Sequence, residues 1–429
     1  MLAKSVKVLL LGAAIGVLGG CSTPCDAPGR LCAPISSITS TPAPQPARRV
    51  AETPAAPAAP PETPEARTSA VEIPDAAPPA PAPAPAAPEG AARTGAPVRI
   101  ALLLPLRSEA LGAAAASLRA GFMAAYERDR DGFAVSVIET GDAPQDVLAA
   151  YARAQEQHEL IVGPLARSAV GALAASALVR KPTIALNHPE GRAALPPAML
   201  AMGLSIEEEA RQVATWAAAE QANGNALILS AGAPWQRRIA SAFAAQWQRL
   251  GLGADSVEMS ALNGYLSDSE LVQLRARVQG APPGLLFVAM DADQARQLRV
   301  ALGPDIPLYG TSSLNPGVGR GSSGPAMDGV RLLDLPWQVQ RDHPAVMVYP
   351  HPTPEDERKL SADMERLYAL GIDAFRVARE IALHPKSRFK LDGVTGKLSV
   401  SFGQGPASFQ RVEQAAVYRN GVLGPANPP

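Results

Sequence analysis

The sequence is poor in charged and aromatic residues. Of its 429 residues only 18% are charged and 4% are aromatic, and the formal net charge is −1. A nearly neutral chain has no excess of Lys and Arg with which to bind a phosphate backbone. We therefore expect no nucleic-acid partner, and composition alone indicates no other partner.

Recognised catalytic and metal-binding motifs are also missing. The five histidines, His158, His188, His343, His351 and His384, form no His-Glu-x-x-His pair or other ligand spacing. All except His158 directly precede a proline, which places those four at turns. The sequence has no Gly-x-Ser-x-Gly elbow and no phosphate-binding loop. We therefore expect no metal, no cofactor and no enzymatic activity.

Two short sequences match catalytic patterns without the context that those patterns need. Gly319–Gly324 (GRGSSG) fits the dinucleotide-binding spacing, but no strand is expected before it and no helix after it, so it indicates a loop. Ser387–Lys390 (SRFK) has the Ser-x-x-Lys spacing of penicillin-binding enzymes without a Ser-x-Asn or Lys-Thr-Gly motif. Both matches are interpreted as coincidences.

The apolar run nearest the N-terminus, Val8–Leu18, is too short to span a bilayer and follows Lys4 and Lys7. This is the pattern of a signal peptide, predicted over residues 1–20. Leu18–Cys21 (LGGC) resembles the site cut by lipoprotein signal peptidase, so Cys21 is the predicted lipid attachment site. By resemblance to enteric lipoproteins, Ser22 favours the periplasmic face of the outer membrane. The alternative is an ordinary cleaved signal with an incidental cysteine.

Residues 21–97 form the predicted lipidated N-terminus and linker. Cys25 and Cys32 could close a small disulfide loop or remain unpaired. From about Ala33 to Pro97 the composition is dominated by Pro and Ala, which cannot bury a core and favour extended polyproline II conformations. We interpret this stretch as a disordered, semi-rigid tether, with a recruitment site for proline-binding domains as the alternative.

The folded part is predicted over residues 98–425 and begins with a strand, a tight loop and a long helix in Val98–Glu127. Apolar runs typical of strands then alternate with stretches of helical periodicity, in two successive series. This pattern indicates an α/β fold with two Rossmann-like lobes. Lobe 1 is expected at approximately 98–205 plus a later return, and lobe 2 at approximately 206–310 plus the C-terminal strands. The predicted crossings between lobes are Gly203–Ile206, Tyr309–Asn315 and Val330–Trp337.

Ligands of such sheets bind outside the carboxyl ends of the strands. The candidate cleft residues at those positions are Arg107, Ser108, Gly163, Asn187, Ser230, Asp291 and Thr311. For an amino-acid ligand, Ser108 and Thr311 could bind the carboxylate and Asp291 the ammonium group. The alternative is that these are ordinary loop residues that cap helices.

Separated blocks across Val98–Leu423 resemble one known family. They include ALLLPL, LIVGPL, GLSIEEEARQVA, MDGVRLLDLPW, RLYALGIDAFRVA and LDGVTGKLSV. They are similar to penicillin-binding-protein activator lipoproteins of the LppC or LpoA type. That resemblance implies a type I periplasmic-binding-protein-like domain with three crossover strands, and enteric members carry a helical-repeat domain before it.

The same resemblance implies a function. It implies an outer-membrane lipoprotein that binds and activates a class A penicillin-binding protein, a peptidoglycan synthase of cell-wall synthesis. The alternative is a periplasmic solute-binding lipoprotein with an amino acid or similar small molecule in the cleft.

Overall fold

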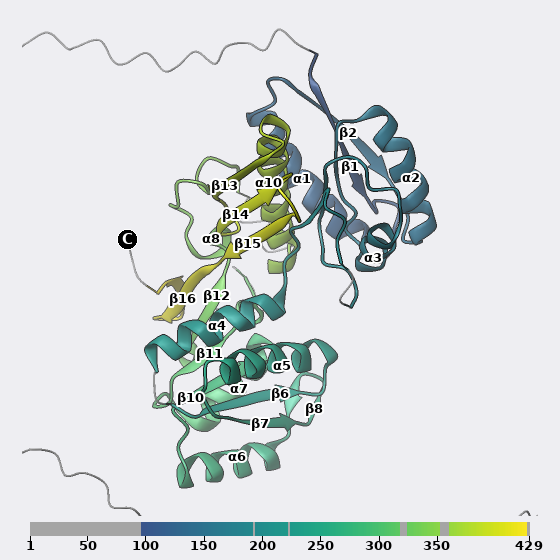
Figure 1. Ribbon diagram of the computed structural model, residues 1–429. Helices are drawn as coiled ribbons and strands as arrows, with labels where there is room; N and C mark the ends of the chain where they lie inside the picture. The colour runs from purple at the N-terminus through teal and green to yellow at the C-terminus, as the bar shows by residue number, and fades with distance from the viewer. Residues whose placement is uncertain (1–95, 192–193, 222–223, 318–323, 352–359, 427–429) are drawn as a thin grey trace, which may run out of the picture. The chain divides into compact units, whose positions relative to one another are not determined.

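The computed structural model describes residues 96–191, 194–221, 224–317, 324–351 and 360–426. The predicted signal peptide, Cys21, the pair Cys25 and Cys32, nearly all of the Pro/Ala stretch and most of Gly319–Gly324 lie outside the described residues. The described part has an α/β fold with two main sheets (Figure 1).

Lobe 1 is built on a parallel five-stranded sheet in the order β2-β1-β3-β4-β5. Its strands are β1 (Val98–Leu104), β2 (Phe133–Glu139), β3 (Leu160–Val162), β4 (Thr183–Ala185) and β5 (Met199–Ala201). The connecting helices are α1 (Gly112–Arg128), α2 (Pro144–Gln157) and α3 (Arg167–Ala175). Helices cover both faces of the sheet, which explains why Ile100 to Leu104 are all fully buried.

Lobe 2 contains a seven-stranded sheet in the order β17-β16-β12-β11-β10-β6-β7. Its strands are β6 (Ala226–Ala231), β7 (Ala254–Met259), β10 (Leu285–Ala289), β11 (Leu308–Gly310), β12 (Arg331–Asp334), β16 (Gln414–Arg419) and β17 (Val422–Pro425). The helices are α4 (Ile206–Glu220), α5 (Pro234–Arg249), α6 (Asp268–Gly280) and α7 (Ala292–Leu302). Neighbouring strands pair in parallel from β7 to β12, whereas β16 pairs antiparallel with β12 and β17 pairs antiparallel with β16.

A short hairpin, β8 (Ala261–Leu262) and β9 (Tyr265–Leu266), precedes α6. Two single turns of 3₁₀ helix, η1 (Ser312–Leu314) and η2 (Pro325–Met327), lie between β11 and β12. Leu314 of η1 and Met327 of η2 belong to the buried cluster of the lobe 2 sheet, so the chain does not leave the lobe between β11 and β12.

The chain then returns to lobe 1 through α8 (Pro336–Val339) and α10 (Ala362–Leu383). A separate antiparallel sheet follows, formed by β13 (Ser387–Asp392), β14 (Lys397–Phe402) and β15 (Ser408–Val412). Side chains of α10 and of β14 belong to the same buried cluster as the lobe 1 sheet. β16 continues directly from this small sheet into lobe 2.

Helices α1 and α10 lie side by side, and glycines allow their backbones to approach closely (Figure 1). A Cβ atom on Gly121 would come within 1.9 Å of the Tyr368 carbonyl oxygen, and one on Gly371 within 2.1 Å of the Leu118 carbonyl oxygen. No L side chain fits at either place without moving a helix. This contact fixes α10 to lobe 1.

The expected crossings are partly wrong. Met202–Ser205 joins the two sheets, and Leu335 begins the return to lobe 1, as predicted. Tyr309–Asn315 is not a crossing, because β11 and β12 on either side of it pair in parallel within lobe 2. The third crossing instead lies at Val412–Gln414, between β15 and β16.

The long helix was expected from Glu355, but residues 355–359 lie outside the described residues. Helix α10 begins at Ala362, where the Ser361 hydroxyl oxygen accepts the Met364 N–H at 3.2 Å. Strand β5, only three residues long, was not expected at all.

Candidate functional site

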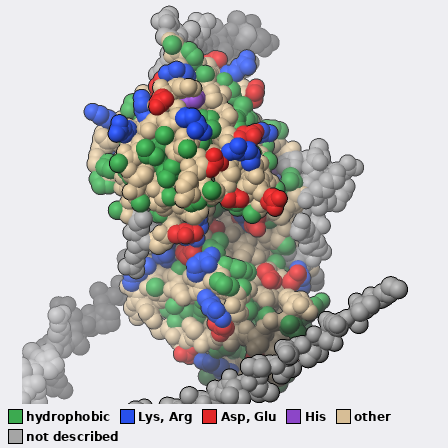
Figure 2. All heavy atoms as spheres, turned by 90° about the vertical axis from the view of Figure 1, so that its right-hand side faces the viewer, with side chains coloured by type: hydrophobic (Ala, Val, Ile, Leu, Met, Phe, Trp, Pro, Cys, Tyr) green, Lys and Arg blue, Asp and Glu red, His purple; other side chains and the backbone are tan. Residues whose placement is uncertain are grey.

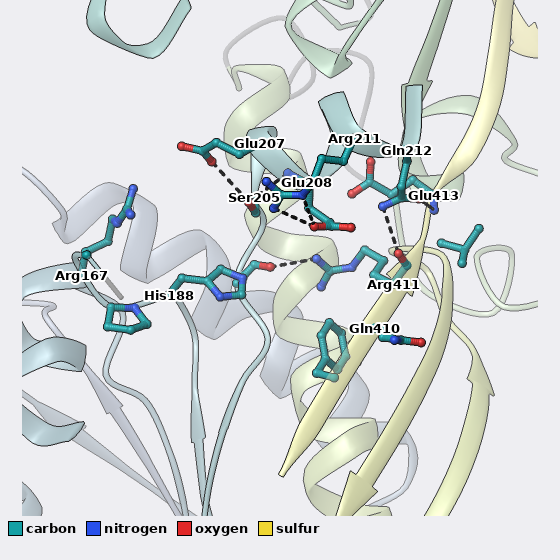
Figure 3. A pocket seen from close by; sticks show the side chains of 15 residues that line it. Arg167, His188, Ser205, Glu207, Glu208, Arg211, Gln212, Gln410, Arg411 and Glu413 are labelled. Atoms are coloured by element: carbon teal, nitrogen blue, oxygen red, sulfur yellow. Dashed lines mark hydrogen bonds and ion pairs between the residues drawn. The ribbon is translucent and has the colours of Figure 1, made fainter. Parts of the chain in front are cut away.

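A cavity of about 590 Å³ lies where the first and third crossings meet lobe 1 (Figure 3). Its walls come from the start of α3, the loop after β4, the first turns of α4, and β15 with the residue that follows it. These segments are far apart in the sequence. The cavity therefore exists only because the first and third crossings bring them together.

Arg411 holds the third crossing against the first. Its Nη1 and Nη2 atoms donate to the carbonyl oxygens of Gly203 and Met202 at 2.9 and 3.2 Å, and its Nε donates to Thr395 Oγ1 at 3.0 Å. Thr395 in turn donates from Oγ1 to Asp373 Oδ2 of α10 at 2.7 Å. One buried chain of hydrogen bonds thus links β15, the first crossing and α10.

Gln212 and Ser205 position the start of α4 against β15. The Gln212 side-chain amide donates to the Arg411 carbonyl oxygen at 3.0 Å and accepts the Glu413 N–H at 3.1 Å. The Ser205 hydroxyl oxygen caps α4 by accepting the Glu208 N–H at 3.2 Å. The side chains on this wall are therefore held by specific bonds.

A second buried group joins α10 to lobe 2. Arg366 donates from Nε and Nη2 to the two carboxylate oxygens of Asp334 at 3.0 and 2.8 Å, and from Nη2 to the Ser312 carbonyl oxygen at 3.0 Å. Asp334 is fully buried and Arg366 is 7% exposed. Burial disfavours the charge on Arg366, but the Asp334 carboxylate raises the pKa of Arg366 above its ordinary value.

Two further carboxyl groups are buried beside this pair. Glu209 on α4 accepts the Ser312 N–H at 3.0 Å, and Glu413 follows β15. Burial raises the pKa of Glu209 to about 7, and the Asp334 carboxylate adds to the rise. Burial also raises the pKa of Glu413 well above its usual range, and the Glu209 carboxylate raises it further.

This arrangement predicts that proton uptake by Glu209 stabilises the fold. The folded-state pKa is raised, so the stabilising contribution is fully present below the ordinary value of 4.5 and is lost as the pH rises through about 7. Between pH 5.5 and 8 the wild-type chain should lose on the order of 2 kcal/mol that Glu209→Gln does not lose. Urea unfolding of both chains across this pH range measures the difference.

Glu208→Gln provides the matched control, since Glu208 lies on the same helix, is exposed, and pairs with Arg211. It should keep the wild-type pH dependence. If Glu209→Gln shows the same pH dependence as the wild type, Glu209 does not titrate as described.

The structure does not gather the seven predicted cleft residues into one site. Arg107 is exposed and pairs with Asp146 at 2.8 Å, and the Ser108 hydroxyl oxygen accepts the Leu111 N–H at 2.8 Å just before α1. Gly163 has a φ of +120°, and a Cβ there would come within 2.1 Å of the Leu103 carbonyl oxygen. Gly163 therefore serves a close strand contact.

The remaining four are spread over both lobes. Asn187 donates to the Leu165 carbonyl oxygen at 3.1 Å, whereas its neighbour His188 lines the cavity. Ser230 and Thr311 are buried at the ends of β6 and β11. Asp291 caps α7 by accepting the Gln294 N–H at 2.9 Å, and it alone of the seven lines a second cavity of about 510 Å³ near the start of α10. The role of the seven in ligand binding stays a prediction.

The sequence did not point to the residues that line the larger cavity from β15. Arg411 and Glu413 stand in RVEQ, and charged residues in such a short stretch ordinarily indicate solvent exposure. Both are in fact at most 8% exposed. Two charges separated by one residue and followed by the apolar run AAVY were the only signal, and that signal is weak.

Membrane-spanning helices and clusters of metal ligands are both absent from the described residues. In that part of the chain no helix is both long and apolar enough to cross a membrane. Nor does it contain a group of three or more His, Cys, Asp or Glu side chains placed to hold a metal ion. On the face shown in Figure 2, Lys and Arg side chains are interspersed with Asp and Glu, so this face has no broad patch of one sign.

Comparison with known proteins gives consistent matches. The model of the family described as "LppC putative lipoprotein" matches residues 92–421. The "penicillin-binding protein activator LpoA" of Edwardsiella piscicida is 27% identical over 307 residues, which are 62% of this chain and 43% of that protein. The protein of the same name from Aliivibrio fischeri is 25% identical over 338 residues, which are 71% of this chain and 54% of that protein. The chain thus spans about half the length of these curated relatives.

Solved structures share the fold. A "putative branched-chain amino acid ABC transporter" from Chromobacterium violaceum is 34% identical with a TM-score of 0.61, covering 75% of this chain and 100% of the other. The "LpoA (YraM) C-domain from Haemophilus influenzae, a regulator of PBP1A" is 22% identical with a TM-score of 0.61, covering 77% of this chain and 100% of the other. At 22% identity the second match supports the two-lobed fold alone.

Proposed function

The chain belongs to the LppC lipoprotein family, and on this premise we propose that it binds a peptidoglycan synthase of the class A penicillin-binding type and raises its activity. The observation that carries the proposal is the match to relatives named penicillin-binding protein activators, at 25–28% identity over more than 300 residues. The structure titled a regulator of PBP1A has the same two-lobed fold. An activator needs a binding surface and no catalytic groups.

The N-terminal part of the sequence supports the same proposal physically. A lipid on Cys21 would hold the protein at the outer membrane, on its periplasmic face. At about 3.1 Å per residue, a Pro-rich stretch of roughly 60 residues reaches at most on the order of 180 Å from that anchor. Confinement within reach of a synthase raises the effective concentration, so that a modest interface suffices.

The anchor gives a direct prediction. Cys21→Ala removes the thiol at the predicted lipid attachment site, so the variant should incorporate no radiolabelled fatty acid and should leave the outer-membrane fraction. Cys25→Ala, four residues further on, is the matched control and should be labelled like the wild type. Lipid labelling of the Cys21 variant at the wild-type level would show the assignment to be wrong.

Binding to the synthase is tested by capture from a detergent extract of the cell envelope with the full chain as bait. Bound penicillin-binding proteins can be identified with a fluorescent β-lactam, which labels their active-site serine. We expect one class A protein to be enriched over a control bait with the same tether sequence, residues 21–97, alone. Equal recovery of all penicillin-binding proteins on both baits would contradict the proposal.

A second candidate function is a solute receptor for an amino acid. The observation that favours it is the 34% identity to the Chromobacterium violaceum protein, whose description names a branched-chain amino acid transporter. In that case Asp291 and Thr311 would bind the ligand together with residues of lobe 1. Tight binding of leucine, isoleucine or valine, lost in Asp291→Ala, would favour this function over activation.

A further inference from the structure

Most charged groups on the wall of the larger cavity already have partners. Glu207 pairs with Arg238 at 2.9 Å, and Glu208 pairs with Arg211 at 2.7 Å. Arg411 is saturated by carbonyl and hydroxyl oxygens. Two groups of opposite kind remain, the Arg167 guanidinium and one carboxyl oxygen of Glu413.

Arg167 opens α3, and its guanidinium has neither an ion pair nor a hydrogen bond within the part of the chain that the structure describes. Together with Arg411 it makes this end of the cavity positive. His188 lies between them. Burial lowers the pKa of His188, and the positive charges of Arg411 and Arg167 lower it further. The two guanidinium charges favour an anion at this end of the cavity.

Glu413 is 8% exposed, and its Oε2 atom has no hydrogen-bond partner among the described residues. A buried polar atom without a partner is costly, and in a native structure such an atom needs a reason. The atom belongs to a residue on the cavity wall, although Glu413 also borders a smaller cavity of about 150 Å³. A polar group of a ligand would supply the missing bond.

The two free groups stand apart. Figure 3 shows Arg167 on one side of the cavity and Glu413 on the other, with His188 and Arg411 between them. A ligand that reaches both must be elongated, with an anion at one end and a neutral polar group further along. The volume of about 590 Å³ is within the range of about 300–1,000 Å³ that small-molecule sites occupy.

We propose that this cavity binds a short peptide, whose free C-terminal carboxylate pairs with Arg167 and one of whose backbone amides bonds to Glu413. A peptide amide suits Glu413 in either protonation state, since it offers both an N–H donor and a carbonyl acceptor. Phe409 of β15 provides an apolar wall for a side chain. The site is separate from the seven cleft residues and does not depend on synthase activation.

The location of this cavity couples peptide binding to the relative placement of the two lobes. A peptide held there would touch lobe 1 through Arg167, the first crossing through Ser205, and the third crossing through Glu413. Binding would therefore favour one relative placement of the lobes over others.

Native mass spectrometry of the full chain tests the proposal, with a tripeptide library that carries free C-termini as the probe. We expect bound tripeptides, and at least about tenfold weaker binding of the same library with amidated C-termini or of single amino acids, because a charge-assisted bond is lost. Arg167→Ala should weaken binding by a similar factor. Arg119→Ala, an exposed arginine on α1 away from the cavity, is the matched control and should bind like the wild type.

Glu413 is tested by rescue. Glu413→Leu should weaken tripeptide binding, and Glu413→Gln should restore most of it, because glutamine keeps a donor and an acceptor at the same place. Since Arg167 is exposed, Arg167→Ala tests the site even if the Glu413 variants fold poorly. The proposal is overturned if no tripeptide binds at about 1 mM, if amidated tripeptides bind equally well, or if Arg167→Ala binds like the wild type.

Discussion

Replacing Arg366 by methionine should lower the free energy of unfolding by about 3–5 kcal/mol. Arg366 and Asp334 form a two-bond ion pair in a fully buried place, and methionine fills much of the arginine volume without its charge. The Asp334 carboxylate would remain buried, and among the described residues its remaining hydrogen bonds would come only from Asn315 and the Leu335 N–H. The loss comes mainly from that uncompensated charge.

Urea unfolding followed by circular dichroism measures this difference. The double variant Arg366→Met with Asp334→Asn should recover a large part of the loss, since no charge is then left unpaired. Arg388→Met is the matched control, because Arg388 is exposed on β13 and has no ion pair in the described part of the chain, and it should change stability by less than about 0.5 kcal/mol. An equal effect of both single substitutions would contradict the role given to Arg366.

Replacing Gly371 by alanine should also destabilise the fold strongly, by at least about 2–3 kcal/mol. In an isolated helix the same change stabilises by about 1 kcal/mol, because alanine loses less backbone entropy. Here the added Cβ would lie 2.1 Å from the Leu118 carbonyl oxygen and 2.7 Å from the Phe122 nitrogen, so α1 and α10 must separate. The steric cost exceeds the gain in helix propensity.

The matched control is Gly280→Ala at the end of α6, where a Cβ would meet no atom within 4 Å. That variant should be as stable as the wild type or more stable. Thermal unfolding of the two variants side by side checks the prediction. It fails if Gly371→Ala unfolds at or above the wild-type temperature.

The fold was predictable where local sequence and packing agree. The apolar run Ile100–Leu104 of β1 and the whole of β10 are buried and pair in parallel with their neighbouring strands. The return to lobe 1 near Val330–Trp337 was also predictable, because a short apolar run there precedes a long amphipathic helix. These signals depend on neighbours in sequence, which is why sequence alone carries them.

Other features depend on contacts that the sequence does not encode locally. Strand β5 has only three residues and exists by pairing with β4, so its length gives no periodicity to detect. The segment Tyr309–Asn315 has the polar, turn-rich composition of a linker, yet the strands on either side of it pair with each other. A composition that favours loops does not say which strands the loop joins.

The larger cavity was the least predictable feature. Arg411 bonds to Gly203 across 208 residues, and the cavity wall around it forms only when the first and third crossings meet. Carboxyl ends of strands are a sound guide to one edge of each sheet, and they led to Asp291 and to the neighbourhood of His188. They do not point to a strand that arrives from a separate sheet.

We propose that this chain activates a peptidoglycan synthase. The most direct measurement is the rate of glycan polymerisation and peptide crosslinking by each purified class A penicillin-binding protein of the source bacterium, with and without the full chain. We predict that the chain raises the rate of one synthase at equimolar ratio. The Arg366→Met variant, assayed under conditions that unfold it, should not raise the rate. Unchanged rates for every class A synthase, with a folded wild-type chain present in excess, would contradict the claim.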